Sequence, residues 1–92
     1  MNEVRLYLVA YDIAAPRRWR RVYKALLRVG ERRQLSVFLC RLDPVRMARL
    51  RARLVGAVDP AEDRLMVVDL GPAATAAARL DGEAHRGTPL VL

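Results

Sequence analysis

The sequence predicts a small α+β sandwich, in which two amphipathic helices pack on one face of a β-sheet. Its 92 residues, 53% of them hydrophobic, match the size and composition of one folded domain spanning residues 1–92. Runs with strand-like alternation flank two segments whose apolar residues recur at helical spacing. The order of strand, helix, extended run, helix and strand is that of a ferredoxin-like sandwich, βαββαβ if the extended run holds two strands.

The first predicted strand covers residues 4–11 and is apolar on both alternating faces, as expected of a central strand buried on both sides. It stops at Asp12. Pro16 marks the first helical position, because its fixed φ and missing N–H suit that place. This helix is expected to end at Gly30 through a left-handed cap. Its apolar face holds Trp19, Val22, Tyr23 and Leu26, and its cationic face holds Arg17, Arg21, Lys24 and Arg28.

Residues 32–42 are predicted to be extended, because apolar residues alternate along them. Eleven residues exceed the usual five or six of a strand, so the run is either one long bent strand or a tight hairpin. The interpretation favoured here is a break near Ser36. Cys40, in the second half of the run, is expected to be a buried small hydrophobe.

A second helix is predicted over residues 45–55, with Asp43 as its N-cap and Pro44 in its first turn. Gly56 is expected to end it, and a third strand follows at residues 64–70. Turns are expected at Asp59–Pro60 and at Gly71–Pro72. The helix should bury Met47, Leu50 and Leu54 and expose Arg46, Arg49 and Arg53.

The C-terminal segment, residues 73–92, is predicted as a tail with an extra strand. Residues 73–80 form a short alanine-rich helix, and residues 81–87 a polar loop that includes His85. Residues 89–92 suit an edge strand, because their proline comes first.

The basic residues are concentrated in one part of the chain. The formal net charge is +7, yet thirteen basic and only two acidic residues lie between Arg17 and Arg53, which gives that segment +11. This asymmetry predicts a basic face for DNA or RNA, held through phosphates rather than bases. The alternative is that the arginines reflect an arginine-rich proteome and serve only to keep the outer faces of the helices in contact with water.

Several classes of protein are disfavoured. One histidine, one cysteine and one serine cannot supply zinc-ligand spacing or a nucleophilic triad. A lone cysteine and the lack of a signal peptide or a long apolar run favour the reducing cytoplasm, with no membrane partner. A chain of this size buries only about two thirds of its unfolded surface and is marginally stable alone, which favours a homodimer.

Asp12 is the candidate metal ligand, because an acid directly after a buried strand sits in a loop on a rigid scaffold. A structural capping role for Asp12 stays open. In a two-fold dimer two Asp12 side chains can share one Mg²⁺ per dimer. The neighbouring Tyr11 can orient a water or fill a dimer contact.

The sequence resembles the CRISPR-associated protein two family, the small "Cas two" proteins of spacer acquisition. The likeness runs through YLVAYDI (residues 7–13), the basic helix at residues 17–30, the Q-x-S-V-F core at residues 34–38 and RLMVVDL, about three quarters of the chain. It implies a ferredoxin-like homodimer whose last strand, here residues 89–92, crosses to the partner's sheet. It also implies a magnesium-dependent endonuclease for single-stranded RNA or double-stranded DNA, and a central dimer that bridges two dimers of the CRISPR-associated integrase.

The resemblance makes Asp12 the metal ligand. Leu39 stands where relatives often carry Glu, and Trp19 where many carry a polar residue. A structural DNA-bridging protein without catalysis, or a free-standing toxin-like ribonuclease, fits the same sequence. The predicted catalytic residues are Tyr11, Asp12, Ser36 and Phe38, and the predicted phosphate contacts are Arg17, Arg18, Arg20, Arg21, Arg32 and Arg33.

Overall fold

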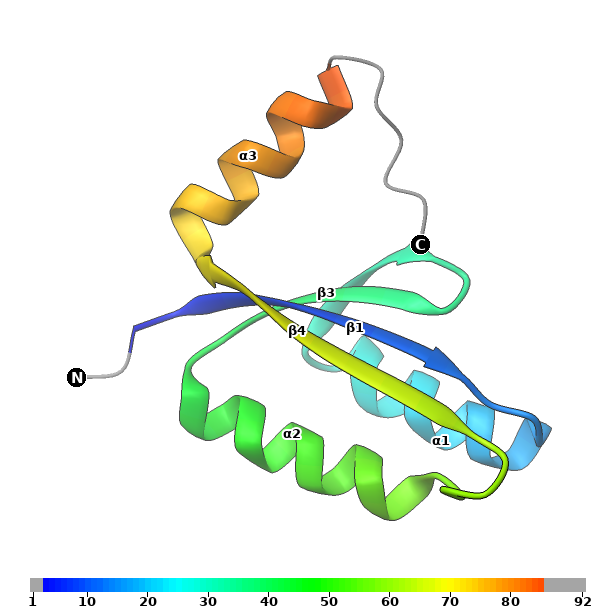
Figure 1. The fold of residues 1–92 in the computed structure, drawn as a ribbon. Coiled ribbons are helices and arrows are strands. Elements are labelled where there is room, and N and C mark those ends of the chain that lie inside the picture. The colour runs from blue at the N-terminus through cyan, green and yellow to red at the C-terminus, as the bar shows by residue number, and fades with distance from the viewer. Residues whose placement is uncertain (1–2, 86–92) are drawn as a thin grey trace.

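A four-stranded antiparallel sheet with strand order β2-β3-β1-β4 forms the centre of the protein. The computed structural model describes residues 3–85, and side chains for residues 3–80. Helices α1 and α2 cover one face of the sheet, while α3 packs on the other (Figure 1). This arrangement confirms the predicted α+β fold with ferredoxin-like strand order. The elements are β1 (Arg5–Asp12), α1 (Pro16–Leu27), β2 (Gly30–Gln34), β3 (Val37–Leu42), α2 (Pro44–Ala57), β4 (Arg64–Pro72) and α3 (Ala73–His85).

Strand β1 is buried on both faces, as its sequence predicts. Tyr7, Val9 and Tyr11 belong to the core beneath α1 and α2. Leu6 and Leu8 belong to a second, smaller core beneath α3. Because β1 lies between β3 and β4, both of its edges are also hydrogen-bonded. The strand that ends at the candidate metal ligand is therefore held in place from four sides.

The extended run is a hairpin that breaks at Leu35–Ser36, which confirms the favoured interpretation. Gln34 pairs with Val37, so the turn has two residues. The turn is attached to the central strand, because the Tyr11 N–H donates to the Ser36 carbonyl oxygen at 3.1 Å. Ser36 is thereby held next to the end of β1.

Gly30 is not the left-handed helix cap that the sequence predicts. The positive-φ glycine of residues 3–85 is Gly71 (φ 108°), and Gly30 instead opens β2. A Cβ built at Gly30 would lie 2.6 Å from the Cys40 Sγ and 2.9 Å from the Leu39 carbonyl oxygen. Close approach of β2 to β3, rather than backbone handedness, is therefore what requires glycine here.

Helix α2 begins as predicted. The Asp43 side chain accepts a hydrogen bond from the Arg46 N–H at 2.8 Å, which satisfies a first-turn donor. The helix runs through Gly56 and ends one residue later, at Ala57. Its buried side chains are the predicted Met47, Leu50 and Leu54.

Helix α3 is longer than predicted. Residues 81–85 continue the helix to His85, where a polar loop was expected. Ala76 is buried and Leu80 packs beside it on the second core, so tertiary contacts anchor the first turns. Each further residue then adds one hydrogen bond to an existing helix, which is much easier than nucleation. The strand predicted at residues 89–92 lies outside the described residues.

Cys40 is fully buried, and burial raises the pKa of its thiol to about 11. A buried thiol that stays protonated at neutral pH is a poor nucleophile. We therefore expect less than one tenth of the thiol to react with Ellman's reagent within an hour at pH 8, and complete reaction in 6 M guanidinium. Rapid labelling of the native protein would contradict the packing of β3 described here.

Candidate nucleic-acid interface and metal site

The exposed carboxylate of Asp12 stands at the carboxyl end of β1, opposite Arg64 in the pairing of β1 with β4. An open groove lies at this end of the sheet, and it brings Asp12 together with the predicted site residues Tyr11 and Ser36. The full lining is Ala10, Tyr11, Asp12, Ser36, Val37, Asp63, Arg64, Leu65 and Met66.

Tyr11 positions the hairpin turn beside Asp12. Its ring is buried, and its hydroxyl donates to the Leu35 carbonyl oxygen at 3.3 Å. Burial raises the pKa of this hydroxyl, so it stays protonated at neutral pH. With the backbone bond to Ser36, Tyr11 makes two links to the turn. Its contacts thus fit a positioning residue.

Phe38 does not line the groove, because its side chain has no exposed surface. Its ring packs 6.3 Å from that of Tyr11 and 5.8 Å from that of Tyr23. Trp19 stacks in turn on Tyr23, with the ring centroids 4.8 Å apart. The structure therefore corrects the assignment of Phe38 to the site: it supports Tyr11 from within the core and cannot contact a substrate.

The predicted phosphate contacts fall into different places. Arg17, Arg20 and Arg21 are exposed on α1 and make no ion pair with any described residue. Arg32 is exposed on β2, with its guanidinium 5.9 Å from the centre of the Tyr23 ring. These four side chains are free to contact a polyanion.

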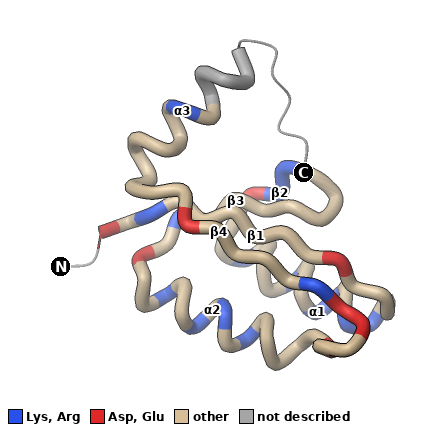
Figure 2. The backbone as a smooth tube through the Cα atoms, viewed as in Figure 1, with Lys and Arg blue, Asp and Glu red and all other residues tan. Residues whose placement is uncertain are grey.

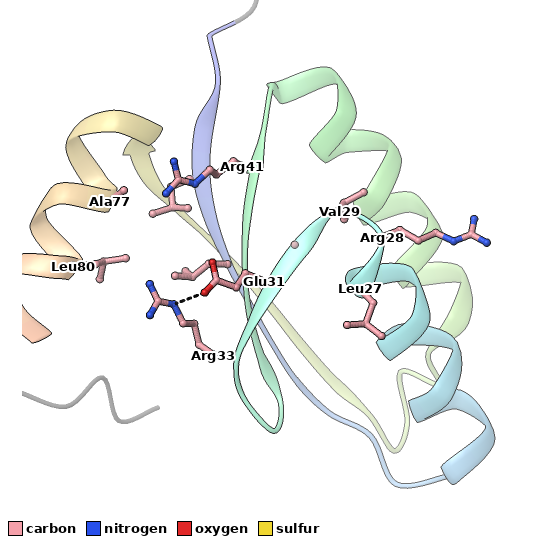
Figure 3. A pocket seen from close by; sticks show the side chains of 11 residues that line it. Leu27, Arg28, Val29, Glu31, Arg33, Arg41, Ala77 and Leu80 are labelled. Carbon is pink, nitrogen blue, oxygen red and sulfur yellow. Dashed lines mark ion pairs between the residues drawn. The ribbon is translucent and has the colours of Figure 1, made fainter.

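Arg33 lines a separate pocket beside β2, which is bordered by α3 on one side and by the end of α1 at Leu27 on the other (Figure 3). Its Nε lies 3.9 Å from a carboxylate oxygen of Glu31. Arg41 and Leu80 line the same pocket. Arg33, predicted as a phosphate contact, therefore does not line the Asp12 groove.

Arg18, predicted as a phosphate contact, is instead paired within the chain, and its side chain is only 25% exposed. Its Nε donates to Asp63 at 2.7 Å, and its Nη2 donates to Glu62 at 3.0 Å. The Asp63 side chain is fully buried. Because these carboxylates already occupy its guanidinium, Arg18 fastens α1 to the segment before β4.

Asp63, which the sequence did not single out, organises the backbone behind Asp12. Besides Arg18, its carboxylate accepts hydrogen bonds from the backbone N–H groups of Ala14 at 3.0 Å and Asp59 at 2.8 Å. The Arg18 guanidinium and these N–H groups hold the pKa of Asp63 well below its usual range. The sequence signal for Asp63 is its place between the Asp59–Pro60 turn and an apolar strand. Its main partner, Arg18, lies 45 residues away in the sequence, so local patterns do not reveal the pair.

One chain does not complete a metal site within its described residues. No three of their His, Cys, Asp or Glu side chains form a group that could hold an ion. The Asp63 carboxylate also lines the groove, but its oxygens already accept four hydrogen bonds. Asp12 is therefore the one free carboxylate that the described part of the chain offers there.

An apolar patch adjoins Asp12 on the face of the sheet opposite α1 and α2. Met66 and Val68 are 48% and 37% exposed and point to this face, because Leu65 and Val67 point toward the helices. Helix α3 covers only the other end of the same face. We call the exposed part, Met66 and Val68 with Ala10 beside Met66, the β4 patch.

A sequence model of the family described as "CRISPR associated protein Cas2" matches residues 5–76. The chain belongs to this Cas2 family. A relative from Geobacter sulfurreducens, named CRISPR-associated endoribonuclease Cas2, is 48% identical over 68 residues, which are 74% of this chain and 72% of that protein. A relative of the same kind from Rhodospirillum rubrum is 46% identical over 72 residues, 78% of this chain and 71% of that protein.

Solved structures agree with this assignment to the Cas2 family. Cas2 from Streptococcus pyogenes matches with a TM-score of 0.64 and 31% identity, over 68% of this chain and 82% of that chain. A hypothetical protein from Thermus thermophilus matches with a TM-score of 0.69 and 37% identity, over 75% of this chain and 95% of that chain. The family match includes the whole Asp12 groove and only the first turn of α3. Among the described residues, no helix combines the length and the apolar character needed to cross a membrane.

Proposed function

We propose that this chain is a homodimeric CRISPR-associated endonuclease that acts on RNA or DNA through a magnesium ion shared by two copies of Asp12. The observation that carries the proposal is the free, exposed carboxylate at the end of a rigidly held central strand. Its relatives are named endoribonucleases, which supports the same chemistry for this chain.

The β4 patch supports a dimer that would complete the site. A second copy that covers Met66 and Val68 would remove exposed apolar surface from water, which is favourable. Met66 lines the same groove as Asp12, so a two-fold axis through the patch would bring the two carboxylates toward each other.

In this dimer the two Asp12 carboxylates would hold the metal, because oxygen ligands suit Mg²⁺. A magnesium ion there would supply a water of lowered pKa and would screen charge on the attacked phosphate. Tyr11 holds the hairpin turn at the edge of the site. The exposed Arg17, Arg21 and Arg32 would bind flanking phosphates.

Asp12→Asn is expected to abolish metal-dependent cleavage while leaving the fold intact, because the side chain is exposed and nearly isosteric. We would incubate the wild type and the variant with labelled single-stranded RNA and duplex DNA, in Mg²⁺ or in EDTA. Titration calorimetry should detect one Mg²⁺ per wild-type dimer and none for the variant.

Asp69→Asn is the matched control, because Asp69 is an exposed acid on the same strand pair, away from the groove. It should cleave as the wild type does, and size-exclusion chromatography should show dimers for all three proteins. Cleavage retained by a dimeric Asp12→Asn protein would overturn the assignment.

A second candidate function is a scaffold without catalysis that carries nucleic acid between dimers of the CRISPR-associated integrase in spacer acquisition. Two observations favour it. The described residues offer a single free carboxylate in the groove, and position 39, where relatives often carry Glu, holds a buried leucine and so supplies no second acid. Nucleic-acid binding in EDTA by the Asp12→Asn variant, with no cleavage by the wild type, would favour this function.

A further inference from the structure

Arg64 is a cation in the Asp12 groove, and it lies outside the basic run between Arg17 and Arg53. It is the first residue of β4 and stands opposite Asp12 in the pairing of β1 with β4. Figure 2 shows this basic position at the start of β4, beside the acidic position that ends β1. The acid proposed to hold the metal therefore has an arginine as its direct neighbour across the sheet.

Asp12 and Arg64 point to the same face of the sheet. Side chains alternate between the two faces along a strand, and Tyr11 and Leu65 contact the core beneath α1 and α2. Asp12 and Arg64 come next to them in the sequence and so point to the opposite face. Residues directly opposed in an antiparallel pair have Cβ atoms about 4.5–5.5 Å apart. The two charged groups can therefore act on one ligand.

The Arg64 guanidinium is free to bind such a ligand. Arg64 is exposed and forms no ion pair with any described residue. The two acids that precede it, Glu62 and Asp63, both bind Arg18 instead. An arginine that has carboxylates close by and pairs with none of them is available to an anion from outside the chain.

The charges of the groove leave room for that anion. Arg18 compensates Asp63, so one chain contributes one free negative charge, Asp12, and one free positive charge, Arg64. In the proposed dimer the two Asp12 carboxylates alone would cancel the charge of a magnesium ion and leave no net attraction for a phosphate. The Arg64 side chains of the two copies would restore that attraction.

We propose that Arg64 binds the phosphodiester group that lies beside Asp12 in the groove. A guanidinium presents its N–H donors in a planar fork, which matches two oxygens of a phosphate. The inference rests on the proposed cleavage at Asp12. It adds a substrate contact on β4, whereas α1 with its arginines covers the other face of the sheet.

Loss of the Arg64 charge should have opposite effects on the binding of magnesium and of nucleic acid. R64Q removes a positive charge next to Asp12, so Mg²⁺ alone should bind at least about threefold more tightly. The same change removes a charged hydrogen bond to phosphate, so nucleic acid should bind about 10- to 100-fold more weakly. An arginine that only stabilises the pairing of the strands would not shift the two affinities in opposite directions.

The matched control is R41Q. Arg41 is an exposed arginine on the same face of the sheet, because its neighbour Cys40 lies in the core beneath the helices. It stands opposite Leu6, near the other end of β1, and does not line the Asp12 groove. R41Q therefore removes the same charge from the same face without touching the proposed site.

The experiment measures the two affinities separately. Titration calorimetry would give the Mg²⁺ affinity of the wild type, R64Q and R41Q. Nucleic-acid affinity would be measured in EDTA for D12N, D12N/R64Q and D12N/R41Q, because these proteins cleave nothing and have no carboxylate at position 12 to repel phosphate. Anisotropy of labelled single-stranded RNA and of duplex DNA would give each Kd, and the probe that loses more affinity is the one that enters the groove.

R64K is a second test, because it keeps the charge of Arg64 but not the planar fork. It should bind Mg²⁺ as the wild type does, and D12N/R64K should bind nucleic acid more weakly than D12N and more tightly than D12N/R64Q. Size-exclusion chromatography would check that each protein is a dimer. If R64Q does not form one, R64K decides the question by its effect on nucleic-acid binding.

Three results would contradict the role of Arg64. They are equal affinities of the R64Q and R41Q proteins for both ligands, weaker binding of both ligands, and nucleic-acid binding that is unchanged or tighter in D12N/R64Q. If the wild type cleaves and D12N does not, while R64Q behaves as R41Q does, the inference fails and the proposed function stands. If the wild type neither binds Mg²⁺ nor cleaves, the proposed endonuclease fails, and the inference fails with it.

Discussion

Phe38→Ala is expected to lower the free energy of unfolding by about 3–5 kcal/mol, the usual cost of removing a fully buried aromatic ring. The change leaves a cavity between Tyr11 and Tyr23, and it removes two aromatic contacts worth about 0.5–1.5 kcal/mol each. The total free energy of unfolding of a small domain is only about 5–15 kcal/mol. Urea unfolding followed by circular dichroism would measure the loss.

Phe38→Leu is the matched control, because it keeps most of the buried volume and should cost much less than the alanine variant. Both variants should be measured at one protein concentration, since the stability of a homodimer depends on it. A loss below about 1 kcal/mol for Phe38→Ala would show that the ring is not enclosed as described.

Asp63→Asn is expected to destabilise the protein strongly at neutral pH and less in acid. The folded state holds the pKa of Asp63 well below its usual range, so the ionised carboxylate stabilises the fold above the unfolded pKa of about 3.9. That contribution disappears as the pH falls toward the folded pKa. The difference between the urea midpoints of the wild type and the variant should therefore be largest at pH 7 and shrink steadily toward pH 2.5.

Asp69→Asn again provides the comparison. Its carboxylate also accepts from an arginine, Arg5, at 2.8 Å, but it is 46% exposed. Solvent screens such a pair, so the substitution should change the urea midpoint far less than Asp63→Asn. Equal effects of the two substitutions at pH 7 would contradict the special role of the buried carboxylate. Asp63→Asn should also weaken the proposed cleavage, because an amide has one acceptor oxygen in place of two and cannot hold both the Ala14 and the Asp59 N–H groups behind Asp12.

Local patterns predicted most of the elements of this fold. The apolar alternation of β1 and the helical stripes of α1 and α2 report directly which side chains are buried, because burial follows the period of each element. The length of the extended run suggested a break near Ser36 but left one long bent strand as an alternative. Asp12, Tyr11 and Ser36 were placed together by the resemblance and by their positions at strand ends, and they do share one groove.

Features that depend on distant contacts were not predictable in this way. Arg18 belongs to the cationic run of α1 by sequence, and only the folded chain brings it to Asp63. Gly30 follows a helix and so suggested a cap, but the close approach of β3 is what determines it. The sequence predicted a row of cations on each of α1 and α2, but only the packing of the two helices shows that the rows lie side by side.

The pairing of β1 with β4 also has a consequence for biosynthesis. Leu8 and Val68 are neighbours in the sheet but lie near opposite ends of the described chain. While the ribosome has not yet released β4, β1 can pair only with β3, and its other edge stays open. An apolar strand with an open edge is a template for aggregation. Nascent chains and fragments that end before Arg64 are therefore the forms of this protein most in need of chaperones.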